Sequence, residues 1–437
     1  MRVRVRRPSR GLAGTMEVPG DKSISHRAAV VGALAMGPTE ISGFLEAEDC
    51  LGTLRALGAL GVEVTRKGPG QYRIGGVGLA GLQEPDTVLD CGNSGTTARL
   101  LLGVLAGQPF WSMLTGDDSL RRRPMGRVSG PLTQMGATVV GRGEGSRLPL
   151  AIRGARPLRG YAYRSHVPSA QVKSALLLAG LYADGPVSVE EPALSRDHTE
   201  RMLAAVGARV AVDGLRVTLT PGGELRGRPV QVPGDVSSAA FFLVAGAIVP
   251  GSTVTVSRVG INPSRTGLLD ALREMGAEVR VSEPVDGGEP AATLQVSASR
   301  LRGTRVGGAQ IPRLIDELPA LAVAAACGEG VTEVRDAAEL RVKESDRIQA
   351  VITELSKLGA RVEERADGFR IEGGAPLRGT LVQSWGDHRM AMALIIAGLV
   401  AEGQTVVEDT QCVATSYPEF LATLNALTPE PCAFAEQ

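Results

Sequence analysis

The densest charged group in the chain comprises Lys343, Glu344, Asp346 and Arg347. Lys343 and Arg347 are four residues apart, so they would share one face of a helix that reached back to Lys343. Glu344 lies between these two cations in sequence, and nearby positive charge favours an ionised carboxylate. The segment therefore fits either an anion-binding site or an internal network of salt bridges.

Two further segments place a cation where a helical run begins. Lys22 and Arg27 flank Ser23 and Ser25, either of which could cap the helix, and Arg389 follows a candidate cap at Asp387. A cation at a helix N-terminus opposes the helix dipole, and a bound anion would explain its presence. A solvated pair of cations is the alternative.

Three weaker signals accompany these segments. Gly95, beside small hydroxylated residues and followed by Arg99, permits close backbone approach to an oxyanion, although a plain turn needs the same residue. Arg123 ends an arginine run in a loop, which is usually solvated surface. Asp316 and Glu317 begin a helical run, where two carboxylates satisfy the helix dipole by capping alone.

These groups belong to a repeated pattern of polar clusters followed by apolar, Ala-rich helical runs. A second, amphipathic helix follows each of the first five clusters and ends at a glycine, at a nearly constant distance from the cluster. One such helix is predicted from a cap at Ser345 to Gly359. The pattern predicts about six copies of one α/β unit, each with a buried helix. The clusters begin at Asp21, Asn93, Ser169, Asp235, Asp316 and Asp387, and the glycines are Gly61, Gly136, Gly207, Gly276 and Gly359.

A larger duplication divides the chain. The motif V-P-G-D-x-S occurs at residues 18–23 and again at 232–237, and a chain of 437 residues suggests two domains. We expect domains at 13–230 and 231–437, with three units each. The first copy carries Lys22, His26 and Arg27 where the second has only apolar residues, so these three are the better candidates for chemistry.

Composition excludes several classes of protein. The 47 basic and 47 acidic residues cancel, and aromatic residues make up 3%, which argues against nucleic-acid partners. No apolar run is long enough for a membrane span, and the basic N-terminus lacks the apolar stretch of a secretory signal. Five scattered cysteines indicate reduced thiols in a cytoplasmic protein. We find no metal-ligand spacing and no P-loop, and expect an enzyme that binds phosphorylated substrates between two domains without metal or cofactor.

The segments PGDKSISHRA, GNSGTTARL, RRPM, PSAQVKSA, IDELP, RVKESDRI, GDHRMAMA and ATSYPEF resemble, in order, the enolpyruvyl transferase family. The resemblance covers almost the whole chain and points to the class II branch that acts on shikimate 3-phosphate. It implies an inside-out α/β barrel fold of two domains, each with three βαβαββ units. It also implies that strand 1–12 joins the second domain. Small-molecule substrates and a monomer are expected.

The implied reaction moves the enolpyruvyl group of phosphoenolpyruvate to the 5-hydroxyl of shikimate 3-phosphate and releases phosphate, through a tetrahedral intermediate. Asp316 is the candidate base and Glu344 the candidate acid, with Lys22 also placed to take part. Ser195 and Arg196 are further candidates near the sugar phosphate. The residues implied for phosphoenolpyruvate are Lys22, Gly95, Arg123, Gln171, Arg347 and Arg389. Those implied for shikimate 3-phosphate are Lys22, Ser23, Arg27, Ser169, Ala170, Gln171, Asp316 and Lys343.

Three positions depart from the family's pattern: Thr415 replaces a common Lys, Ala170 a Ser, and Glu339 an Asn. Some glyphosate-insensitive members have Ala at the position of Gly95, so we expect glyphosate to compete with phosphoenolpyruvate here.

Two rival interpretations are less favoured. Relatives that act on UDP-N-acetylglucosamine normally carry a Cys in the loop before Arg123, where this chain has Asp118. A non-catalytic repeat scaffold would not explain why only one of the V-P-G-D-x-S copies carries Lys, His and Arg.

Overall fold

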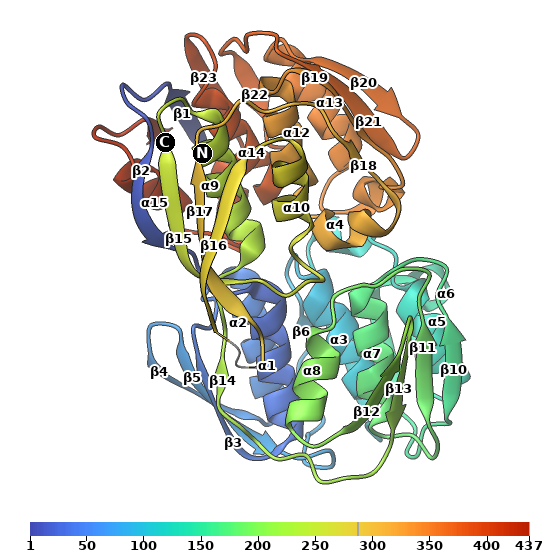
Figure 1. The fold of residues 1–437 in the computed structure, drawn as a ribbon. Coiled ribbons are helices and arrows are strands. Elements are labelled where there is room, and N and C mark those ends of the chain that lie inside the picture. Colours follow the sequence, from blue (N-terminus) through green and yellow to red (C-terminus); the bar gives the residue numbers. More distant parts are fainter. Residues whose placement is uncertain (286–287, 437) are drawn as a thin grey trace. The chain divides into compact units, whose positions relative to one another are not determined.

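The computed structural model describes residues 1–285 and 288–436, which form two compact units (Figure 1). One unit is Gly20–Val232, and the other joins Met1–Pro19 to Pro233–Gln437.

The described residues form six four-stranded sheets with one shared topology: a parallel pair of strands extended by two antiparallel neighbours. In Gly20–Val232 the orders are β14 (Val230–Gln231), β3 (Met36–Ser42), β5 (Gln71–Val77), β4 (Glu63–Gly68); β6 (Leu89–Asp90), β7 (Trp111–Thr115), β9 (Arg147–Arg153), β8 (Thr138–Gly141); and β10 (Tyr161–Arg164), β11 (Val187–Glu190), β13 (Arg216–Thr220), β12 (Arg209–Asp213). In the other unit they are β2 (Ala13–Glu17), β15 (Thr253–Gly260), β17 (Ala291–Ser297), β16 (Glu278–Val285); β18 (Arg305–Val306), β19 (Gly330–Val334), β21 (Gly368–Gly373), β20 (Arg361–Arg365); and β22 (Leu381–Gln383), β23 (Gln404–Glu408), β1 (Arg2–Arg6), β24 (Ala433–Glu436).

Inside each unit three helices pack together, almost wholly buried, with the sheets around them (Figure 1). Their Ala-, Leu- and Gly-rich sequences have no polar face, so they are stable only when enclosed. They coincide with the six predicted runs. They are α1 (Lys22–Leu34), α3 (Gly95–Leu105) and α7 (Ala170–Gly180) in one unit, and α9 (Val236–Ile248), α12 (Leu318–Cys327) and α14 (His388–Gly398) in the other.

Five amphipathic helices end at the predicted glycines: α2 (Glu48–Ala59), α5 (Gly126–Gln134), α8 (His198–Ala205), α10 (Gly267–Glu274) and α13 (Arg347–Lys357). Each glycine has a positive φ, as a left-handed helix end requires. After α13, Gly359 at φ 92° lets the amide of Ala360 donate to Leu355 O at 3.0 Å. Short helical segments complete the chain: α4 (Asp118–Arg122), α6 (Arg142–Gly145), α11 (Ile311–Leu314), α15 (Phe420–Ala426), η1 (Gly308–Gln310), η2 (Ala338–Val342) and η3 (Thr410–Thr415).

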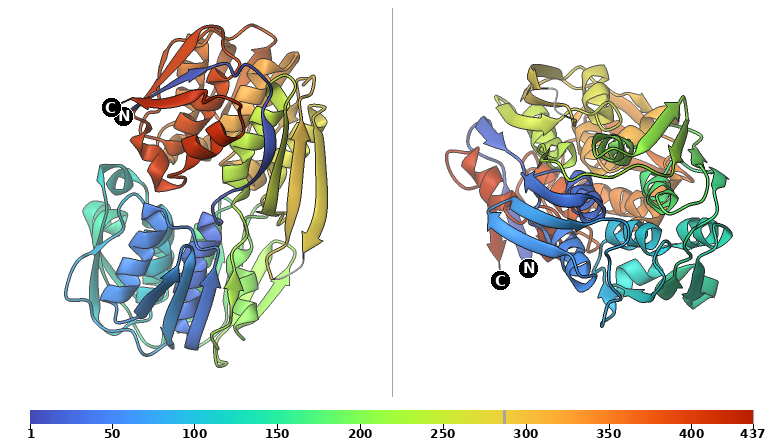
Figure 2. Two further views of the ribbon diagram at one scale, coloured as in Figure 1. Left: turned by 90° about the vertical axis from the view of Figure 1, so that its left-hand side faces the viewer. Right: turned by 90° about the horizontal axis from the view of Figure 1, so that it is seen from below.

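The N-terminal strands complete sheets made by much later residues. β1 lies between β23 and β24, with Val3 and Val5 fully buried. β2 pairs in parallel with β15, so residues 13–17, which we placed in the N-terminal domain, belong to the sheet of the later unit. Both views of Figure 2 show the two chain ends side by side, as the pairing of β1 with β24 requires.

Two predicted helix caps are wrong. Asp21, rather than Ser23 or Ser25, caps α1 by accepting from the amide of Ile24 at 2.9 Å. Asp346, rather than Ser345, caps α13. The helix therefore begins at Arg347 and does not reach back to Lys343. In both cases the carboxylate is the stronger acceptor for free amides at a positive helix end.

The glycine after α13 should be irreplaceable for conformational reasons alone. An alanine Cβ at Gly359 would meet Pro376 O at 3.6 Å, an ordinary contact, so strain would come only from φ. We expect Gly359→Ala to lower the free energy of unfolding by about 1–2 kcal/mol in denaturant titrations. The control is Gly58→Ala inside α2, where a Cβ meets nothing within 4 Å. It lowers the conformational entropy of the unfolded chain by the same amount and should not destabilise the folded protein. Equal stabilities of the two variants would contradict the prediction.

Candidate active site

In Gly20–Val232 the predicted ligands gather at the N-termini of α1, α3 and α7, where free backbone amides favour anions. On α1, Lys22 Nζ lies 2.5 Å from Asp49 Oδ2 on α2, and its side chain is 17% exposed. Ser23 Oγ accepts from Arg196 Nη1 at 3.0 Å. We call Lys22, Ser23, Gly95, Arg123, Ser169, Gln171 and Arg196 the basic cluster.

Gly95 is the first residue of α3, and two guanidinium groups crowd it. A Cβ added there would lie 2.8 Å from Arg99 Nη1 and 3.4 Å from Arg123 Nη1. Arg99 donates to Gln171 Oε1, whose amide nitrogen donates to Thr96 Oγ1 at 2.9 Å. Arg123 donates to Asn93 Oδ1 at 2.8 Å. Arg99 therefore links two predicted ligands, Gly95 and Gln171, although we did not count it among the ligands.

At α7, Ser169 accepts from the amide of Val172 at 3.5 Å, and its own amide donates to Glu191. A hydroxyl that accepts still has a proton to donate, so Ser169 remains available to an anion. Ala170 follows as the first helical residue and contributes no hydroxyl.

Arg27 is 3% exposed and is held by its own unit. Its guanidinium donates to Thr199 Oγ1 at 2.7 Å, Ser174 Oγ at 2.8 Å and Ser23 O at 2.9 Å. These bonds join α1 to α7 and α8, so Arg27 is part of the framework in this structure. Its predicted contact with shikimate 3-phosphate stays a prediction.

His26 occurs in only one copy of the duplicated motif and is fully buried. Burial, followed by the charges of Lys22 and Arg27, lowers its pKa well below the ordinary value. The neutral ring begins a chain of hydrogen bonds. Its Nδ1 lies 2.7 Å from Thr53 Oγ1, which lies 2.7 Å from Thr97 Oγ1, and Thr97 Oγ1 donates to Ser94 Oγ at 2.8 Å. His26 thus connects α1, α2 and α3 internally.

In the other unit, Arg347 binds three carboxylates at once. Its Nε lies 2.7 Å from Asp387 Oδ2, Nη1 lies 3.1 Å from Asp316 Oδ1, and Nη2 lies 2.7 Å from Glu344 Oε2. We call Asp316, Lys343, Glu344, Arg347, Asp387 and Arg389 the carboxylate cluster. Although burial opposes a charged guanidinium, the three carboxylates raise the pKa of Arg347 above its ordinary value.

Asp387 is fully buried between a cation and a helix N-terminus. Burial alone would raise its pKa, but the charge and hydrogen bond of Arg347 outweigh that effect and lower it. Asp387 also accepts from the amide of Arg389 at 2.9 Å, as the predicted cap of α14, and from Ser345 Oγ at 3.1 Å. The sequence pattern predicts Asp387 as the cap of α14 but does not predict its ion pair with Arg347, because the two residues lie 40 apart in the sequence.

Asp316 faces the remaining cations of this cluster. Lys343 Nζ lies 3.5 Å from Asp316 Oδ1, and Arg389 Nη2 lies 4.0 Å from Asp316 Oδ2. The capping interpretation of Asp316 and Glu317 is wrong: Glu317 makes no side-chain cap to α12, and it accepts from Ser237 Oγ. Both carboxylates face side chains from other elements.

Thr415, one of the three departures from the family pattern, makes a hydrogen bond within its own turn. It ends η3, and its hydroxyl donates to Cys412 O within that turn. Within the described residues no cluster of His, Cys, Asp or Glu could hold a metal ion, and no helix is long and apolar enough to cross a membrane.

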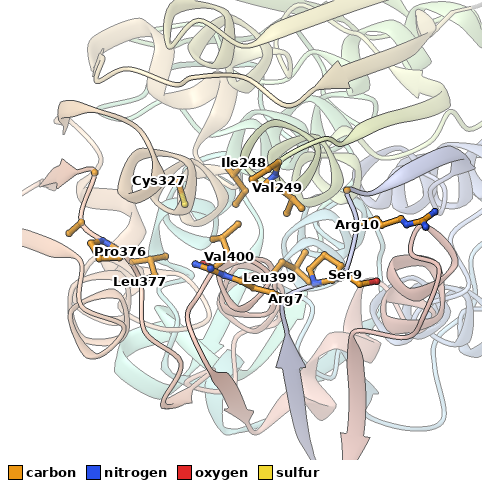
Figure 3. Close-up of a pocket in the computed structure, with 15 residues that line it drawn as sticks. Arg7, Ser9, Arg10, Ile248, Val249, Cys327, Pro376, Leu377, Leu399 and Val400 are labelled. Carbon is orange, nitrogen blue, oxygen red and sulfur yellow. The ribbon is translucent and has the colours of Figure 1, made fainter.

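A cavity of about 500 Å³ lies elsewhere in the unit that contains α14 (Figure 3). It is lined by Ile248, Cys327 and Leu399, at the C-terminal ends of α9, α12 and α14, and by the segment Arg7–Gly11. Arg389 and Asp316 lie at the opposite ends of these helices. Arg7 donates to Val400 O at 2.7 Å, as a cation near helix C-termini should. The cavity is therefore separate from the carboxylate cluster.

Comparison with known proteins agrees with this architecture. Two solved structures of EPSP synthase from Acinetobacter baumannii superpose with TM-scores of 0.89 and 0.88, at 44% and 43% identity over the full length of both chains. The fold is that of the enolpyruvyl transferases, which confirms the predicted class of two domains with three βαβαββ units each.

The family EPSP synthase (3-phosphoshikimate 1-carboxyvinyltransferase) matches residues 6–424, and the chain belongs to it. Relatives named 3-phosphoshikimate 1-carboxyvinyltransferase, from Desulforudis audaxviator and Desulforamulus reducens, are 56% and 53% identical over 97% of this chain and 99% of their own length. The predicted family and its enolpyruvyl transfer to shikimate 3-phosphate are thereby confirmed. The roles of individual residues stay predictions.

The crowding at Gly95 generates a test of anion binding. We expect glyphosate to inhibit the native chain in competition with phosphoenolpyruvate. In Gly95→Ala the new methyl group must displace the end of Arg99, so KM for phosphoenolpyruvate and Ki for glyphosate should each rise roughly tenfold or more. Steady-state kinetics measure both constants.

Gly130→Ala is the matched control, because a Cβ on this exposed face of α5 meets nothing within 4 Å. It should leave both constants unchanged. Unaltered constants in Gly95→Ala would mean that no anion binds beside Gly95.

Proposed function

We propose that the basic cluster and the carboxylate cluster together carry out the enolpyruvyl transfer in this chain. The observation that carries this proposal is Arg347, which is buried among three carboxylates, one of which, Asp316, also faces Lys343 and Arg389. Burying a charged network of this kind costs more in desolvation than a well-packed apolar cluster would, so its presence favours a role beyond stability. Here Asp316 and Glu344 retain 13% and 18% side-chain exposure, so they remain open to a substrate.

Phosphoenolpyruvate is proposed to bind Lys22, Arg123, Gln171, the backbone at Gly95, Arg347 and Arg389. The amide of Gly95 is at the positive end of α3, and Arg123 and Arg99 lie beside it. Arg347 already uses four of its five N–H groups on carboxylates. We infer that it acts on the substrate chiefly by orienting Asp316 and Glu344.

Shikimate 3-phosphate is proposed to bind Lys22, Ser23, Ser169, Ala170 and Gln171, with Arg27 behind them. Arg196, which donates to Ser23 Oγ, adds a cation to this group. Asp316 and Lys343 are the remaining proposed ligands, and their separation of 3.5 Å keeps a charged donor next to the candidate base.

The reaction needs a base at the sugar hydroxyl and an acid at the vinyl carbon. Asp316 removes the proton of the 5-hydroxyl while the oxygen bonds to the central carbon of phosphoenolpyruvate. Exclusion of water by the bound substrates favours protonated Glu344, which gives its proton to the methylene carbon and so forms the tetrahedral intermediate. The Glu344 carboxylate then takes back a methyl proton while the carbon–oxygen bond to phosphate breaks, which restores the vinyl group. The leaving phosphate takes the proton held by Asp316, and Lys22 balances its charge.

A monomeric state and a cytoplasmic location are also proposed. All five cysteines are free thiols, which supports a reducing compartment.

Phosphate release from phosphoenolpyruvate is the direct assay of the function. Turnover should require shikimate 3-phosphate, and UDP-N-acetylglucosamine should not replace it. A chain that releases phosphate only with the UDP sugar would contradict the assignment.

Asp316→Asn tests the proposed base. Asparagine keeps the shape and still accepts from Arg347, but it cannot take a proton. We expect kcat to fall by at least about a hundredfold while the unfolding midpoint stays close to that of the native chain. Asp213→Asn, at an exposed position in β12, should have native kinetics. Near-native turnover of Asp316→Asn would remove Asp316 from the mechanism.

A further inference from the structure

Three ionisable side chains lie buried together beneath the start of α7. Lys173, the one charged residue of α7, places Nζ 2.9 Å from Glu191 Oε2 and 2.8 Å from Glu200 Oε1. Their side chains are only 3%, 4% and 6% exposed. Burying charge in this way costs more than a well-packed apolar cluster would, so its retention calls for a reason other than stability.

Glu191 is the point at which this group meets the basic cluster. Its Oε1 accepts from the amide of Ser169 at 2.7 Å, and its Oε2 accepts from Ser195 Oγ at 2.7 Å. Ser169 caps α7, and Ser195 directly precedes Arg196. One buried carboxylate thus holds both segments that supply proposed ligands of shikimate 3-phosphate.

We infer that Glu191 is a positioning residue for shikimate 3-phosphate, which acts through Ser169 and the Ser195–Arg196 segment and has Lys173 as its counter-charge. The inference rests on the proposed function, because it needs the basic cluster to bind that substrate.

The direction of the hydrogen bond separates the roles of Ser195 and Arg196. A serine hydroxyl has one proton, and Ser195 donates it to Glu191. Toward a phosphate oxygen Ser195 would therefore present only lone pairs, which repel it. Arg196 instead carries charged donors and already reaches Ser23 Oγ. Ser195 orients the segment, and Arg196 contacts the anion.

The charges within the group allow a variant that keeps the fold. Lys173 contributes one positive charge, whereas Glu191 and Glu200 contribute two negative ones. Glu191→Gln leaves Lys173 paired with Glu200, so no buried charge loses its partner. Burial raises the pKa of Glu200, and the charge and hydrogen bond of Lys173 oppose that shift.

Glutamine at position 191 would have one accepting oxygen for three donors: Lys173 Nζ, the Ser169 amide and the Ser195 hydroxyl. We expect Glu191→Gln to raise KM and Kd for shikimate 3-phosphate roughly tenfold, the equivalent of one charge-assisted hydrogen bond. KM for phosphoenolpyruvate and kcat should change less than about threefold. Kinetics and calorimetry of shikimate 3-phosphate binding measure these quantities.

Glu190→Gln is the matched control, since Glu190 is the preceding residue and pairs at the surface with Arg216 at 2.6 Å. It should leave both constants unchanged. Native KM and Kd in Glu191→Gln, with or without a lower unfolding midpoint, would overturn the inference and leave the enzyme's function intact. Absence of turnover in the native chain would instead contradict the proposed function.

The route through Ser195 is tested by combining variants. If Glu191 acts partly through Ser195, then Ser195→Ala raises KM for shikimate 3-phosphate by less than Glu191→Gln, and the double variant is no worse than Glu191→Gln. Fully additive effects would overturn this route. If Glu191→Gln does not fold, Ser195→Ala decides alone: the inference requires its KM for shikimate 3-phosphate to rise, and a native value overturns it.

Discussion

The burial of six helices without a polar face is the constraint on which the structure depends. Each of these helices needs a sheet or another helix on every side, and its first turn still has amides to satisfy. Asp21, Ser94, Ser169, Asp235 and Asp387 meet that need with side-chain caps. The polar helix starts in each unit therefore serve the fold, and the proposed site uses the few of them at which a cation lies beside the capping residue.

The carboxylate cluster shows how one buried cation organises acidic groups. Arg347 holds Asp316, Glu344 and Asp387 in fixed directions, and only the first two keep some exposure. In the basic cluster a carboxylate, Glu191, plays the reciprocal part by collecting donors. In both units, buried charge orients the groups that are proposed to meet a charged substrate, through directional hydrogen bonds that uncharged packing cannot form.

Much of the fold was predictable from the sequence, because apolar helices and glycine stops recur in phase and each has a local physical cause. The six buried helices and the five helix-ending glycines came from such patterns, and the N-terminal strand was implied by the family resemblance. The caps at Asp21 and Asp346 were missed because a serine nearby satisfied the same rule. Contacts such as Lys173 with Glu191, or Arg347 with Asp387, join distant residues, and no local pattern encodes them. Lys173 is nonetheless the one charged residue in an apolar run, and this signal alone predicts that it has a buried carboxylate partner.

The late completion of two sheets has a consequence during synthesis on the ribosome. Residues 20–232 are contiguous, so their three sheets have every strand they need once β14 has emerged. β2 must wait for β15, and β1 must wait for β23 and β24 at the other end of the chain. Until β23 and β24 have been made, Val3 and Val5 have no sheet to enter, so β1 takes its place only after nearly all the other strands described here.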